Sequence, residues 1–105
     1  MIEDFDVEVD GAKLVARRVI PDEFIADSPT LVFLHEGLGC IGMWRGFPEA
    51  MAEATGCVAL LYDRRGYGRS DPRDLPWGID YLQRYATDEL PLVLEACGVE
   101  RPVLV

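Results

Sequence analysis

The sequence is poor in the residues that build disulfide scaffolds, metal sites and nucleic-acid surfaces. Among its 105 residues, three cysteines (Cys40, Cys57 and Cys97) are too few for a disulfide framework, and no two have zinc-clip spacing. Ten basic residues face nineteen acidic ones, so the net charge of −9 disfavours nucleic acid and membranes as partners. The acidic N-terminus is no secretory signal, and no apolar run approaches the ~20 residues of a membrane span. We expect a cytoplasmic protein without a metal site or cofactor.

Catalytic side chains are scarce as well. His35 is the only histidine, and Ser28 and Ser70 are the only serines. A serine hydrolase of the nucleophile-elbow type needs a G-x-S-x-G turn, then an acid, then a histidine, and this order is absent here. Cys40 lies five residues after His35, and a cysteine–histidine pair can form a nucleophilic dyad. The alternative is that Cys40 is a small loop residue and His35 a hydrogen-bonded loop anchor.

The N-terminal segment predicts a β-hairpin over residues 4–20. Phe5, Val7 and Val9 alternate with acidic residues, which is typical of a half-buried strand. Asp10 and Gly11 then form a favoured hairpin turn pair.

Residues 30–105 predict alternating strands and helices. Continuous apolar runs indicate buried strands at 30–34, 57–62 and 102–105. Helices are expected at 48–55 and 81–97, the second with a kink or a break at Pro91. Its apolar face is expected to hold Leu82, Ala86, Val93 and Cys97. The order predicts a single α/β domain over 1–105, in which an antiparallel hairpin leads into a mostly parallel sheet flanked by helices. The open edge at 102–105 suggests a truncated chain, or one that associates through this edge.

Two interpretations of the glycine-rich loop after the first buried strand stay open. Gly37 to Gly42 match G-x-G-x-x-G, and Asp63 ends the next strand, as in a nucleotide-binding module. Gly46 and Pro48 count against this module, because they disfavour a helix that continues from Gly42. The other interpretation is an oxyanion loop, whose bare backbone N–H groups stabilise a negatively charged oxygen.

Two segments, taken in order, resemble the α/β-hydrolase superfamily. The first is Leu31-Val32-Phe33-Leu34-His35-Glu36-Gly37-Leu38-Gly39, followed by Met43-Trp44. The second is Leu61-Tyr62-Asp63-Arg64-Arg65-Gly66-Tyr67-Gly68-Arg69-Ser70-Asp71. In that superfamily one strand runs into H-G-x-x-G and the next ends in D-x-R-G-x-G-x-S-D. The resemblance implies the N-terminal part of an α/β-hydrolase fold and an esterase-like hydrolase acting on a small ester, amide or related bond.

The resemblance also implies roles for residues of both loops. The backbone N–H groups of Gly37 and Leu38 would form half of the oxyanion hole, and His35 would order the loop. Trp44 would line the substrate pocket or pin the loop to the sheet. The further residues that border or shape the site would be Glu36, Gly39, Asp63, Arg65, Gly66 and Gly68. Glu36 replaces the family's glycine, and we expect its carboxylate to point away, because it would oppose the oxyanion charge.

The resemblance places the nucleophile, acid and base beyond residue 105. The chain alone is then expected to be inactive, while the complete protein acts on a small-molecule substrate. Two alternatives remain: the nucleotide-binding module, and a non-catalytic half of a split hydrolase.

Overall fold

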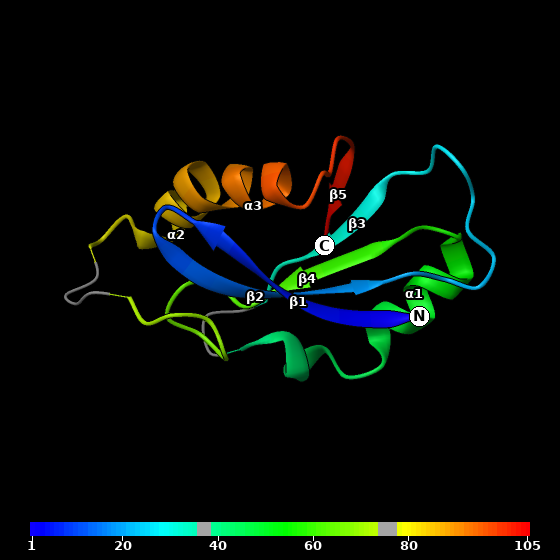
Figure 1. The fold of residues 1–105 in the computed structure, drawn as a ribbon, viewed down its shortest axis with the longest axis horizontal. Coiled ribbons are helices and arrows are strands. Elements are labelled where there is room, and N and C mark those ends of the chain that lie inside the picture. The colour runs from blue at the N-terminus through cyan, green and yellow to red at the C-terminus, as the bar shows by residue number, and fades with distance from the viewer. Residues whose placement is uncertain (36–38, 74–77) are drawn as a thin grey trace.

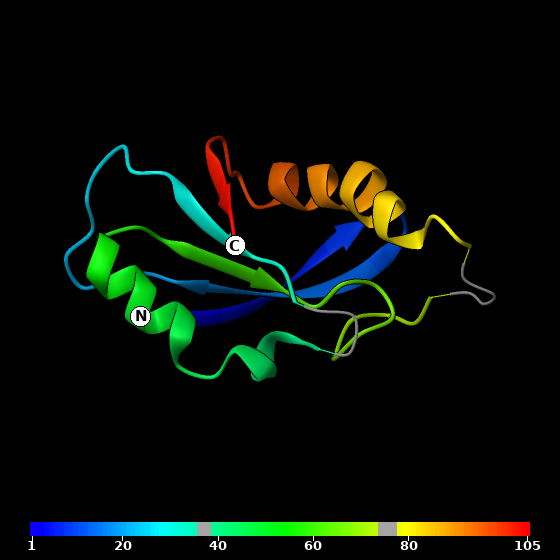
Figure 2. The ribbon, with the colours of Figure 1, turned by 180° about the vertical axis from the view of Figure 1, so that it is seen from behind.

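The computed structural model describes residues 1–35, 39–73 and 78–105, which form a five-stranded sheet with flanking helices (Figures 1 and 2). The strands are β1 (Ile2–Val9), β2 (Ala12–Val19), β3 (Thr30–Phe33), β4 (Ala59–Tyr62) and β5 (Pro102–Leu104), in the spatial order β1-β2-β4-β3-β5. β3 pairs in parallel with β4 and β5. β1 pairs antiparallel with β2, and β2 antiparallel with β4. The predicted α/β fold with its leading hairpin is confirmed, and the sheet is mixed because β2 joins β4 antiparallel.

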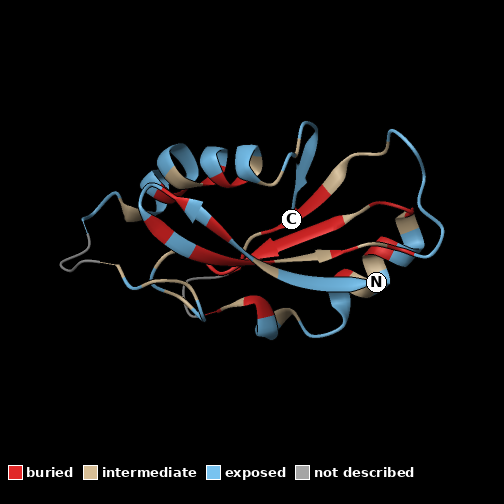
Figure 3. Cartoon of the chain, viewed as in Figure 1, coloured by how far each residue is buried: buried red, intermediate tan, exposed pale blue. Residues whose placement is uncertain are grey.

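The hairpin owes its tight turn to Asp10 and Gly11. Their φ angles are 52° and 79°, in the left-handed region that aspartate tolerates and glycine favours. The register that follows pairs Val9 with Ala12 and continues to Ile2 opposite Val19. Buried and exposed residues alternate in the second half of β1, as the sequence pattern predicts, whereas β2 is continuously buried from Leu14 to Ala16 (Figure 3).

Side-chain alternation along β3 and β4 divides the core into two clusters on opposite faces of the sheet. Val32 and Leu60 belong to the cluster beneath α3 (Leu90–Ala96), whereas Phe33 and Leu61 belong to the one beneath α1 (Phe47–Thr55). Helix α1 has Pro48 in its first turn and ends at Gly56, whose φ of 70° suits a glycine C-cap. A short 3-10 helix, η1 (Ile41–Trp44), precedes α1.

The helical segment at 81–96 contains a π-helical turn. It consists of α2 (Tyr81–Arg84), the π turn η2 (Tyr85–Glu89) and α3. Pro91 has no N–H group, and the Leu90 N–H donates to the carbonyl of Tyr85, five residues earlier. Of the predicted apolar face, Val93 is buried and Cys97 is partly buried, whereas the prediction is wrong for Leu82 and Ala86, whose side chains are exposed. The wider π turn changes the helical register, and Tyr85 is buried instead.

β5 forms one edge of this sheet, beside β3. Val103 and Leu104 keep 45% and 54% of their surface exposed. Within the described ranges, none of the helices combines the length and apolar character that crossing a bilayer requires. In the same residues, His, Cys, Asp and Glu side chains form no group of three or more that could hold a metal ion.

Candidate functional site

A cavity of about 370 Å³ opens at the carboxyl end of β3. Its lining residues follow the strand directly or belong to the start of the next segment: Leu34, His35, Gly39, Met43 and Trp44. Ligands of open α/β sheets bind outside the carboxyl ends of the strands, and this volume suits a small molecule. The cavity is therefore the candidate site, and it brings together three residues that the sequence singled out: His35, Gly39 and Trp44.

Trp44 combines the two roles that the sequence left open. Its ring meets Phe33 edge-on, with 5.1 Å between the ring centroids, and stacks on Phe47 at 6.2 Å. Phe33 is fully buried in the cluster beneath α1. Trp44 therefore fixes η1 to the sheet through these contacts and also forms part of the cavity wall.

His35 connects the loop after β3 to the loop after β4. Its side chain is buried, and its Nε2 accepts the backbone N–H of Arg64 at 3.1 Å. The imidazole ring also packs against Tyr67, with 4.8 Å between the centroids. Because Nε2 accepts this hydrogen bond, it is not available as a base toward Cys40.

Asp63 provides a second connection between the same two loops. It directly follows β4 and is only 2% exposed. Its Oδ1 accepts the backbone N–H of Ile41 at 2.7 Å, and its Oδ2 accepts that of Arg69 at 3.0 Å. The segment between His35 and Ile41 is thus tied at both ends to consecutive residues, Asp63 and Arg64.

The loop after β4 needs glycine at two positions for different reasons. Gly66 has a φ of 92°, and its N–H donates to the carbonyl of Asp71 at 2.8 Å. Gly68 has a φ of 49°, and a Cβ at this position would collide with the Asp63 carboxylate. The two glycines therefore let the loop fold closely around the buried carboxylate.

Ser70 and Asp71 fasten this loop to β2, a role that the sequence analysis missed. Ser70 Oγ accepts the N–H of Val15 at 2.9 Å and donates to the carbonyl of Asp63 at 2.5 Å. Asp71 pairs with Lys13 through its backbone N–H and its Oδ2. The sequence signal that could have revealed this role is the fixed spacing of the D-x-R-G-x-G-x-S-D motif. The polar residues of this motif all make loop contacts here.

Arg65 lines a second cavity of about 260 Å³ next to the hairpin turn. Its N–H donates to Glu89 Oε1 at 3.4 Å, and its Nε donates to the carbonyl of Pro72 at 3.3 Å. Burial raises the pKa of the Glu89 carboxyl, although the Arg65 N–H opposes this shift. The hydroxyl of Tyr85 donates to the Arg65 carbonyl, so Arg65 also links the loop to the helical segment.

Three residues that the resemblance placed at the centre of the site, Glu36, Gly37 and Leu38, lie outside the described residues.

The structure does bear on the nucleotide-binding alternative. The Asp63 carboxylate is buried and occupied by two backbone N–H groups, so it is not available to a ribose. The glycine loop leads into the four-residue η1 rather than a long helix whose N-terminus could hold a pyrophosphate. This alternative therefore loses its physical basis.

No family model matches the chain, and no curated protein matches its sequence. Among solved structures, proline iminopeptidase from Mycobacterium smegmatis is similar, with a TM-score of 0.80, 24% identity, and coverage of 97% of this chain and 34% of that chain. An epoxide hydrolase from Vigna radiata has a TM-score of 0.74 and 25% identity, over 98% of this chain and 31% of its own. A haloalkane dehalogenase from Bradyrhizobium elkani has a TM-score of 0.75 and 21% identity, over 99% of this chain and 32% of its own.

All three are proteins of the α/β-hydrolase fold. This chain has the N-terminal part of the α/β-hydrolase fold. It spans about a third of the length of each of these neighbours. The α/β-hydrolase resemblance derived from the two loops is thus confirmed at the level of the fold.

Proposed function

We propose that this chain forms the oxyanion-loop and substrate-wall side of an α/β-hydrolase that cleaves a small ester, amide or related bond with a serine nucleophile. One observation carries the proposal: His35 and Ile41, which flank Gly37 and Leu38 in the sequence, both bind groups that follow β4, and His35 lines the cavity. The structural neighbours, a peptidase, an epoxide hydrolase and a dehalogenase, support hydrolytic chemistry.

The hydrogen bonds at His35 and Ile41 explain how the segment between them would act in catalysis. Hydrogen-bond donors stabilise a developing oxyanion only if they are fixed before the reaction, and losing one donor typically costs about 10²–10³ in rate. His35 and Ile41 are held by Arg64 and Asp63, so the backbone between them starts and ends at fixed points. Trp44 would hold the apolar part of the substrate against this backbone and keep water out.

The nucleophile would come from outside residues 1–105. Ser70 Oγ is occupied by Val15 and Asp63, and Ser28 Oγ donates to the carbonyl of Gly56 at 3.5 Å. The polypeptide that carries the nucleophile would extend the sheet along the exposed edge of β5. We place the reaction in the cytoplasm, because all three cysteines are free thiols, as a reducing compartment favours.

The test starts from the polypeptide or complex that contains this sequence in its own cells. It is isolated through a tag at Met1, assayed with p-nitrophenyl esters and p-nitroanilides, and labelled with a fluorophosphonate. We expect saturable turnover and a labelled serine outside residues 1–105. Trp44→Ala should lower kcat/KM about tenfold through the lost apolar contact, while Phe24→Ala, another partly exposed aromatic, should leave it unchanged.

The isolated 105-residue chain serves as the negative control and should show no saturable turnover. Turnover by this chain that requires Cys40, or fluorophosphonate labelling of Ser28 or Ser70, would refute an external nucleophile. Absence of hydrolysis by the isolated natural product on every ester and anilide would refute the hydrolase itself.

A further inference from the structure

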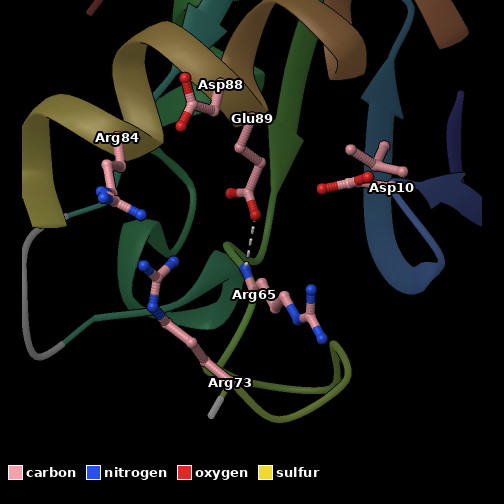
Figure 4. A pocket seen from close by; sticks show the side chains of 7 residues that line it. Asp10, Arg65, Arg73, Arg84, Asp88 and Glu89 are labelled. Atoms are coloured by element: carbon pink, nitrogen blue, oxygen red, sulfur yellow. Dashed lines mark hydrogen bonds between the residues drawn. The ribbon is translucent and has the colours of Figure 1, made fainter. Parts of the chain in front are cut away.

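The 260 Å³ cavity next to the hairpin turn brings three arginine side chains together with three acidic ones. It lies between the β1–β2 turn, the loop after β4 and the helical segment (Figure 4). Its lining residues are Val9, Asp10, Arg65, Arg73, Arg84, Asp88 and Glu89. Three of the chain's ten basic residues thus meet in one cavity, although the net charge is −9. None of these residues lines the cavity at the end of β3.

The three arginine side chains are held in place by contacts outside the cavity centre. The Arg73 guanidinium lies over the ring of Tyr85, 4.9 Å from its centroid. Arg84 Nε donates to Asp80 at 3.2 Å, and Arg65 Nε donates to a backbone carbonyl. Figure 4 shows Arg84 reaching from the helix and Arg73 from the loop toward the same part of the hollow. Because these side chains are already oriented, less side-chain entropy is lost when a ligand binds.

The acidic residues of the cavity do not neutralise this charge by direct pairing. Within the described part of the chain, neither Arg65 nor Arg73 forms an ion pair, whereas Arg17, Arg18 and Arg69 each pair with an acidic side chain on β1. Asp88 accepts the hydroxyl of Thr87 at 3.0 Å, and Glu89 accepts the Arg65 N–H. Among the described residues, Arg65 and Arg73 thus have no carboxylate partner and Arg84 pairs with Asp80 through Nε alone, so guanidinium donors remain for an external anion.

We propose that this cavity binds a small ligand through a phosphate or carboxylate group held between Arg73 and Arg84. A guanidinium presents its donors in a planar fork that matches both oxyanions, and two such forks can grip one group from two sides. The cavity is smaller than a drug-sized site, so it suits an inorganic phosphate, a short phosphate ester or a small organic acid. This inference does not depend on the hydrolase proposal.

The experiment is a titration of the ¹⁵N-labelled chain, observing the arginine Nε–H resonances. One arm adds inorganic phosphate and the other succinate, both at constant ionic strength set with sodium chloride. We expect saturable shifts of the Arg73 and Arg84 signals, and the arm with the higher affinity identifies the preferred group. Arg84→Gln should weaken binding about tenfold or more, because it removes a charge-assisted contact.

Two further variants separate a site from general charge attraction. Arg101→Gln makes the same charge change at an exposed position outside the cavity and should leave the affinity unchanged. Glu89→Gln should strengthen binding severalfold, because it removes a negative charge from the cavity wall and keeps an oxygen for the Arg65 N–H. Arg84 is exposed and pairs only with Asp80 among the described ion pairs, so its variant should stay folded. Linear shifts in both arms, or equal losses in the Arg84 and Arg101 variants, would overturn the site.

Discussion

The loops that leave β3 and β4 differ in what holds them in place. The loop after β4 is fixed by its own contacts and by β2: Asp63 binds Arg69, and Ser70 binds both Asp63 and Val15. The loop after β3 depends on its neighbour, because His35 and Ile41 both bind groups of the β4 loop. The more specific sequence motif therefore lies in the scaffold, and the candidate oxyanion segment rests on it.

Most of the D-x-R-G-x-G-x-S-D motif therefore serves folding rather than chemistry. Its buried aspartate, its glycine at 68 and its serine all contact one another or the adjacent β2. A substitution in the motif should therefore affect the β3 loop at a distance. Substitutions at Asp63, Gly68 and Asp4 probe this dependence, and we expect their effects on stability to decrease in that order.

Asp63→Ala should be the most destabilising change. It leaves the N–H groups of Ile41 and Arg69 without their charged acceptor, and each such loss costs about 1.5–3 kcal/mol. We expect a loss of about 3–5 kcal/mol in urea unfolding, together with faster hydrogen exchange at the Ile41 amide. Asp6→Ala, on the exposed side of β1, is the control and should change little. Unchanged exchange at Ile41 would show that the β3 loop does not rely on this residue.

Gly68→Ala should follow, at about 2–4 kcal/mol, because it combines left-handed backbone strain with a collision against Asp63. The matched control is Gly98→Ala, where φ is 70° but no atom lies within 4 Å of the added Cβ. This control should cost only about 1 kcal/mol of strain. The difference between the two unfolding free energies measures the close approach to Asp63, and equal values would contradict it.

The exposed anchor of the β4 loop should have the smallest effect. Asp4 binds Arg17 at 2.7 Å and Arg69 at 3.0 Å, and these hydrogen bonds, Arg17's foremost, lower its pKa to about 2. A depressed pKa stabilises the fold above the unfolded value of 3.8, and this contribution is lost as the pH falls toward 2. Because the pair is partly exposed, we expect less than about 1 kcal/mol.

The measurement is urea unfolding at several pH values between 5 and 2, for the wild type and Asp4→Asn. The wild type should lose more stability than the variant over this range. Parallel pH profiles would show that the contact with Arg69 does not anchor the loop.

Local sequence patterns predicted the elements that depend on near neighbours. The Asp10-Gly11 turn, the alternation along β1 and the C-cap at Gly56 all follow from conformational preferences of one or two residues. The helical segment at 81–96 shows the limit of such patterns. An irregularity at Pro91 was predicted, and a π turn lies directly before it. Val93 is buried as predicted, but the π turn leaves Leu82 and Ala86 at the surface.

The sequence by itself determined the α/β fold and the two loops where the candidate site lies, because strand periodicity, turn residues and motif spacing are local properties of the chain. Only the tertiary structure decided how those loops depend on each other. The hydrogen bonds from the Ile41 N–H to Asp63 and from the Arg64 N–H to His35 join residues 22 and 29 positions apart. Likewise, Arg73 and Arg84 line one cavity only because the helical segment packs beside the loop. Such contacts exist once the sheet has brought the strand ends together, and no local preference encodes them.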